Sequence, residues 1–200
     1  MKTDIAQFIP FVHENFEFKK NLIQAARDQD KTALPGLLSA TLIYVNTVDY
    51  LAYHILENLR MIVYLTTYNE LGAIVFYEGK NERKDEPLGN VISELKNYSF
   101  PDKEGFLEDL NDFNELRKRY VHNFLKIAPK DVERADRELI EVINISERII
   151  SKYDKITQGI RDGWNSYLSR LSATSKTTIP ITPTDNSSVE EPNKKEKQTK

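Results

Sequence analysis

Two residues of this sequence, Arg117 and His122, have the types and the spacing that cutting RNA without a metal ion requires. They lie within the segment Leu-Arg-Lys-Arg-Tyr-Val-His-Asn, which spans residues 116–123. Arginine stays charged at physiological pH and matches the geometry of a phosphate, whereas histidine gives or takes a proton near neutrality. An arginine shortly before a histidine often arises by chance, so the surrounding elements must decide what this pair means.

The composition favours one helical domain and restricts the chemistry that is available. The 200 residues include 40% hydrophobic and 30% charged side chains, enough for a single core and a tail. Cysteine is absent and only 3 histidines are present, so we expect no disulfide, no metal site and no cofactor. The formal net charge is −3, which means that any contact with RNA needs a local basic patch.

The N-terminal residues contain no apolar signal region, and we expect a cytoplasmic protein. One stretch, residues 32–48, is uncharged and apolar, but Pro35, Gly36 and Asn46 lie near its two ends. The uninterrupted part is too short to cross a bilayer, so we predict a buried core helix and no contact with a membrane.

Helical spacing of apolar residues predicts an all-α bundle of about five helices. We place these helices at about 10–28, 37–68, 88–98, 102–127 and 130–171, and expect Pro35-Gly36 to break the chain. The second helix is apolar on most sides, which is typical of a central bundle helix or an oligomer interface. Residues 71–77 fit either more helix or a short extended run. The polar residues 172–200 predict a disordered tail after a domain over 1–171.

The position of Arg117 on the fourth helix creates two structural requirements. On a straight helix it falls inside the apolar face, so it needs either a cleft or an anionic partner, which Asp49 or Glu57 could supply. His122 then projects to roughly the opposite side, and the two side chains cannot reach one phosphate. A bend near residues 120–122, or a cleft shared by two subunits, would remove this conflict. The alternative is a structural arginine beside a surface histidine.

Two segments carry a resemblance to a known family. Residues 88–95, Leu-Gly-Asn-Val-Ile-Ser-Glu-Leu, and residues 107–123, Leu-Glu-Asp-Leu-Asn-Asp-Phe-Asn-Glu-Leu-Arg-Lys-Arg-Tyr-Val-His-Asn, resemble HEPN domains. Those domains are all-α, and their signature is an arginine, four to six residues and a histidine near the end of the penultimate helix. The likeness covers roughly residues 37–153 and implies an HEPN-like helical bundle.

The resemblance implies a metal-independent endoribonuclease of a toxin–antitoxin or antiviral defence system, with its site in the cleft of a homodimer. His122 would be the general acid or base, and Arg117 would stabilise charge on the phosphate. Four nearby residues would contact RNA: Lys118, Arg119, Asn123 and Lys126. Active members often carry a small polar residue after the arginine, where this chain has lysine. The alternative is therefore a catalytically inactive HEPN-like dimerisation or protein-binding module, with an antitoxin or other protein as partner.

Other residues that could carry chemistry have structural interpretations. His54 lies in the second helix among Tyr50, Tyr53 and Glu57, and we expect a core histidine in preference to a catalytic one. Acidic pairs such as Asp109 and Asp112 are typical of a solvated helix face. The tyrosines of the second helix could stack RNA bases, but their helical spacing favours a core or interface role. These are Tyr44, Tyr50, Tyr53, Tyr64 and Tyr68.

Overall fold

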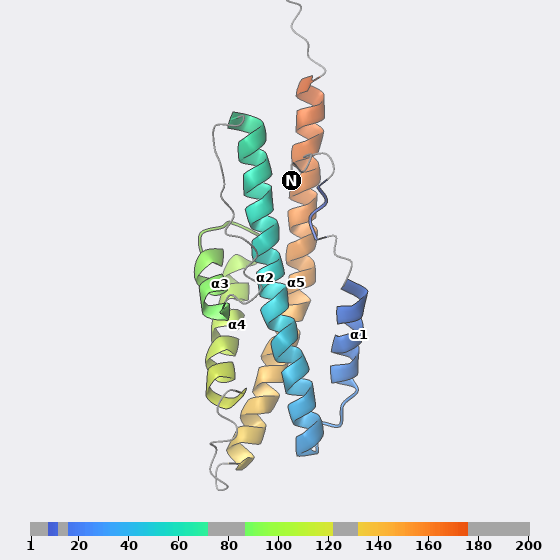
Figure 1. The fold of residues 1–200 in the computed structure, drawn as a ribbon, viewed down its shortest axis with the longest axis vertical. Helices are drawn as coiled ribbons and strands as arrows, with labels where there is room; N and C mark the ends of the chain where they lie inside the picture. The colour runs from blue at the N-terminus through green and yellow to red at the C-terminus, as the bar shows by residue number, and fades with distance from the viewer. Residues whose placement is uncertain (1–7, 12–15, 72–86, 122–131, 176–200) are drawn as a thin grey trace, which may run out of the picture.

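The computed structural model describes residues 8–11, 16–71, 87–121 and 132–175 (Figure 1). Every regular element in these ranges is helical, which confirms the predicted all-α bundle. The elements are α1 (Phe16–Arg27), α2 (Leu34–Leu71), α3 (Leu88–Leu95), α4 (Lys103–Leu116), the π-helical turn η2 (Arg117–Val121) and α5 (Val132–Ser175). None of the described helices combines the length and the apolar character that a membrane span requires.

Helix α2 is the centre of the bundle, as its apolar sequence predicts. It runs side by side with α5 and in the same direction, with α1 on one side and α3 and α4 on the other (Figure 1). Burying one large aliphatic or aromatic side chain contributes about 1.5–3 kcal/mol, so this long contact dominates the stability of the fold. The largest fully buried side chains come from α2, α3, α4 and α5: Tyr44, Ile55, Leu56, Leu65, Leu95, Phe106, Leu110, Phe113, Leu139, Ile149 and Ile156.

The start of α2 differs from the sequence prediction. Pro35 and Gly36 lie inside its first turn and do not break the chain. Proline is tolerated there because the first backbone N–H groups of a helix have no intrahelical acceptor. A Cβ atom on Gly36 would lie 2.1 Å from the carbonyl oxygen of Asp30. Only glycine therefore allows the preceding chain to approach the helix so closely.

The predicted ends of three other helices also require correction. Pro10 and Phe11 form a turn and are not part of α1, which begins at Phe16. Helix α3 ends at Leu95, where residues 88–98 were expected to be helical. Helix α5 continues to Ser175, four residues beyond the predicted boundary. The rest of the predicted tail, and residues 72–77 of the ambiguous stretch, lie outside the described residues.

One carboxylate connects three helices. Glu147 on α5 accepts hydrogen bonds from Arg27 Nε on α1 at 2.8 Å and from Arg27 Nη2 at 2.6 Å. It also accepts a hydrogen bond from the hydroxyl of Tyr44 on α2. The hydrogen bond from Arg27 is the largest cause that lowers the pKa of Glu147, and it outweighs burial, which raises the pKa.

Because the folded state lowers the pKa of Glu147, its stabilising contribution is present above its ordinary value of 4.5. This contribution is lost as the pH falls through the folded-state pKa. Between about pH 5 and pH 2, we expect the unfolding free energy to fall less in Glu147→Gln than in the parent protein. Urea denaturation at several pH values measures this difference. The exposed Glu141, on the same helix, provides the control Glu141→Gln. Equal pH profiles for the two variants would contradict the proposed role of Glu147.

Two glycines one turn apart on α5 give a second test. A Cβ atom on Gly159 would lie 2.6 Å from Cγ of Pro101, whereas one on Gly163 would meet no atom within 4 Å. We expect Gly163→Ala to stabilise the fold by about 0.5–1 kcal/mol because alanine favours a helix. Gly159→Ala should destabilise it by about 1–3 kcal/mol through overpacking. Urea denaturation measures both changes, and the same sign for both would contradict the α5–Pro101 packing.

Candidate functional site

Arg117 lies where α4 passes into the π-helical turn η2, and its side chain is directed at α2. The side chain is only 13% exposed, and its Nη1 forms an ion pair with Oδ2 of Asp49. Its Nη2 donates a longer hydrogen bond, 3.4 Å, to Oδ1 of Asn114. This confirms that Arg117 requires an anionic partner from α2, and the partner is Asp49. The other predicted candidate, Glu57, instead binds Arg60 at 2.5 Å.

The contacts of Arg117 leave one edge of its guanidinium weakly used. Nε is buried and has no hydrogen-bond partner among the described residues, and Nη2 has only the long contact with Asn114. The Nε–Nη2 edge of an arginine is one of the edges that bind a phosphate or carboxylate through two parallel hydrogen bonds. A buried donor without a partner costs about 1–3 kcal/mol, so its presence calls for an explanation.

The π-helical turn corrects the prediction of one straight helix over 102–127. In η2 (Arg117–Val121) each backbone hydrogen bond spans five residues, so the turn is wider than an α-helical turn. A position five residues further on therefore lies nearer the face of the first residue than it does in an α-helix. Single π-helical turns inside α-helices occur frequently at functional sites. The turn begins at Arg117, so the straight helix that creates the facing conflict ends there, and His122 itself lies outside the described residues.

The remaining predicted site residues divide into two groups. His122, Asn123 and Lys126 lie outside the described residues. Lys118 and Arg119 are exposed, as contact with RNA would require, and each has a carboxylate nearby. Lys118 lies 3.1 Å from Glu115, and Arg119 lies 3.8 Å from Glu138. An exposed pair such as Lys118–Glu115 contributes little energy, whereas the carboxylate of Glu138 is only 19% exposed.

His54 is a core residue, as its sequence neighbours predict. Its Nδ1 lies 2.7 Å from the hydroxyl of Tyr153, and Tyr50 stacks on its ring at 5.4 Å. Burial raises the pKa of Tyr153, so this hydroxyl stays neutral at physiological pH. The contact therefore joins α2 to α5.

The other acidic and aromatic candidates also have structural partners. Asp109 accepts contacts from Lys152 at 2.8 Å and Arg148 at 3.1 Å, so its carboxylate joins α4 to α5 and is not a solvated face. Tyr44 is buried in the core. Tyr64 and Tyr68 stack on each other with a centroid separation of 6.2 Å. Within the described residues, no group of three or more potential metal ligands converges.

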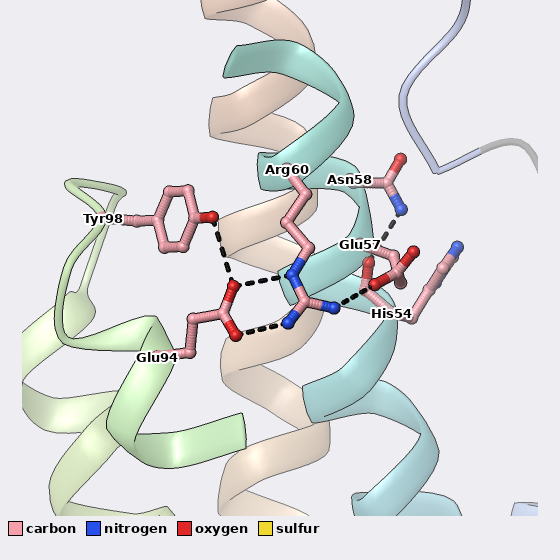
Figure 2. Close-up of polar contacts among 6 residues, drawn as sticks. All are labelled: His54, Glu57, Asn58, Arg60, Glu94 and Tyr98. Atoms are coloured by element: carbon pink, nitrogen blue, oxygen red, sulfur yellow. Dashed lines mark hydrogen bonds and ion pairs between the residues drawn. The ribbon is translucent and has the colours of Figure 1, made fainter. Parts of the chain in front are cut away.

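A second buried arginine was not predicted from the sequence. Figure 2 shows Arg60 of α2 between Glu57 on its own helix and Glu94 on α3. Its Nε donates to Oε1 of Glu94 at 2.6 Å, and its Nη2 forms an ion pair with Oε2 of the same carboxylate. The hydroxyl of Tyr98 also reaches Oε1 of Glu94 at 3.5 Å. Spacing along α2 indicates the contact between Glu57 and Arg60, but nothing in the sequence indicates the bond to α3.

No protein-family model, curated protein or solved structure matches the chain. The resemblance to HEPN domains therefore rests on residues 88–95 and 107–123 and stays a proposal.

The pairing of Asp49 with Arg117 can be measured by a double-mutant cycle. We expect Asp49→Asn and Arg117→Gln to show a coupling free energy of about 1–2 kcal/mol, because the pair is partly shielded from water. The exposed pair Glu115–Lys118 is the control, and its coupling should stay below about 0.5 kcal/mol. Urea denaturation of the single and double variants measures both values. Equal coupling in the two pairs would contradict the conclusion that Asp49 holds Arg117 more strongly than an exposed ion pair would.

Proposed function

We propose that this chain is an HEPN-like, metal-independent endoribonuclease in which Arg117 stabilises the phosphate and His122 transfers the proton. The observation that carries the proposal is the partial pairing of Arg117. Asp49 holds one nitrogen of the guanidinium and fixes its orientation, while the Nε–Nη2 edge lacks a strong partner. An arginine held in advance by a carboxylate loses little freedom when it binds a phosphate.

The proposed reaction needs these two side chains, the RNA and water, which serves as the second proton donor or acceptor. A base removes the proton of a 2′-hydroxyl, and the resulting oxygen attacks the adjacent phosphorus. The bond from phosphorus to the 5′-oxygen then breaks, and that oxygen takes a proton, which leaves a 2′,3′-cyclic phosphate and a 5′-hydroxyl. His122 would serve as the base or as the acid, and a positioned histidine contributes about 10²–10⁴-fold. Arg117 would stabilise the charge of the pentacovalent phosphate.

The environment of Arg117 favours a second candidate as well. Three consecutive cations, Arg117, Lys118 and Arg119, all have carboxylates within ion-pair distance. Such a neutralised surface attracts RNA weakly, because binding of nucleic acid depends on uncompensated positive charge. The second candidate is therefore a catalytically inactive HEPN-like module that forms a homodimer or binds a protein partner such as an antitoxin.

Cleavage of labelled structured RNA and tRNA in EDTA separates the two candidates. We expect the parent protein to produce cyclic-phosphate ends and His122→Ala to lose at least about 100-fold in rate. Arg117→Lys keeps a positive charge beside Asp49 but loses the planar guanidinium edge, so it should lower kcat by at least about 10-fold. Arg60→Lys is the matched control, because the side chain of Arg60 is similarly enclosed and also forms an ion pair but lies outside the motif. This variant should cleave RNA at the parental rate.

The contrary outcomes are equally informative. Cleavage that is unchanged by His122→Ala would remove this residue from the mechanism. Failure of the folded parent to cleave any of the RNAs would favour the inactive module. Sedimentation analysis of the same samples reports whether the homodimer is present, and a monomer at micromolar concentration would count against both candidates.

A further inference from the structure

A short segment before α1 has its main chain held by side chains of α2 and α5. This segment, Phe8–Phe11, is called the arm here. Asn58 of α2 accepts a hydrogen bond from the backbone N–H of Phe11 at 2.8 Å. Arg161 of α5 donates through Nε to the carbonyl of Pro10 and through Nη2 to that of Phe11, both at 3.0 Å. Figure 1 shows the blue arm beside the upper part of α5.

The cleft that holds the arm also binds two aromatic side chains. The ring of Phe11 is buried and meets His54 and Tyr153 edge-on, at centroid distances of 5.4 Å and 6.2 Å. The ring of Phe8 meets Trp164 edge-on at 5.4 Å. Such contacts are typical of aromatic side chains that serve as binding anchors.

The first residue of the arm, Phe8, is also bound through its main chain. Trp164 donates its indole N–H to the carbonyl of Phe8 at 3.0 Å. The side chain of Ile9, between the two anchors, is 62% exposed. The arm, Phe-Ile-Pro-Phe, is thus held by the rings at its two ends and by its main chain, while the side chain of Ile9 is not enclosed.

The backbone of the arm has an unusual conformation at Phe11, where side chains of α2 and α5 contact it. Phe11 has φ of 62°, in the left-handed region that bulky residues rarely adopt. Three polar side chains, those of Asn58, Arg161 and Trp164, are directed at the main chain of the arm. Main-chain hydrogen bonds combined with pockets for alternate side chains are the usual means by which proteins bind extended peptides.

We infer that the cleft formed by Asn58, Arg161 and Trp164, with His54 and Tyr153 at its base, is a peptide-binding site. Its partner is a segment with two aromatic anchors around a residue–proline pair, and the arm is the ligand that occupies it in this chain. The side chains of the cleft all come from α2 and α5, and the arm adds the buried ring of Phe11 to the core between them. This inference is independent of the proposed ribonuclease function, because it involves none of the residues assigned to that site.

Competition from the arm determines how the site responds to a free peptide. A covalently attached segment acts at an effective concentration on the order of millimolar. A free peptide is therefore excluded from the parent protein at micromolar concentration, and a weakened arm should admit it. Phe11→Ala removes the more deeply buried anchor, whereas Ile9→Ala changes only an exposed side chain and is the matched control.

The single tryptophan of the chain, Trp164, reports directly on the cleft. The experiment uses full-length protein and the synthetic peptide of residues 6–12, Ala-Gln-Phe-Ile-Pro-Phe-Val, which contains no tryptophan. We expect Phe11→Ala to shift the emission of Trp164 to longer wavelength, and added peptide to reverse the shift with saturation. The peptide should bind this variant at least tenfold more tightly than it binds Ile9→Ala.

Two further changes test whether the observed binding occurs in the cleft. A peptide with alanine in the place of Phe11 should not restore the emission. Adding Arg161→Gln to Phe11→Ala should weaken binding of the original peptide at least tenfold, because two carbonyl contacts are lost. Circular dichroism checks that the variants stay helical, and Phe8→Ala replaces Phe11→Ala if the latter unfolds. No response of a folded weakened-arm variant to the peptide, or equal responses to both peptides, would overturn the inference.

Discussion

The fold depends on the burial of α2, a helix of 38 residues that contacts α1, α3 and α5. A helix surrounded in this way cannot leave its polar side chains unpaired, because an unpaired buried polar group or charge is costly. Five polar residues on α2 have a partner on a neighbouring element. These contacts are Tyr44 with Glu147, Asp49 with Arg117, His54 with Tyr153, Asn58 with Phe11 and Arg60 with Glu94.

These contacts explain how one apolar helix can position several different elements. Apolar packing is nearly non-directional, so it would allow α3 or the arm to slide along α2 at small cost. A hydrogen bond or ion pair requires a particular distance and angle, and it penalises such displacements. The polar residues of α2 therefore set the register of its neighbours, while the apolar residues supply most of the free energy of folding.

The sequence predicts those features that depend on periodicity. The apolar character of α2 indicates its central place, and the apolar face around Arg117 requires an anion from α2, which the structure supplies at Asp49. The π-helical turn could not be predicted, because hydrogen bonds spanning four or five residues have no distinct side-chain pattern. The arm was also missed, since its partner Arg161 lies 150 residues further along the chain than Phe11. Prediction from local pattern fails where the deciding contacts are distant in the sequence.

Two arginines in this bundle show how a structural arginine differs from a candidate functional one. Arg60 and Arg117 have side chains that are 15% and 13% exposed, and each forms an ion pair that involves α2. In Arg60 all three nitrogens bind carboxylate oxygens, so its donor capacity is directed to holding α2 against α3. In Arg117 a carboxylate binds only Nη1, and Nε has no hydrogen-bond partner among the described residues. Burial and charge pairing alone do not distinguish the two residues. The number of guanidinium nitrogens already bound to carboxylates does distinguish them.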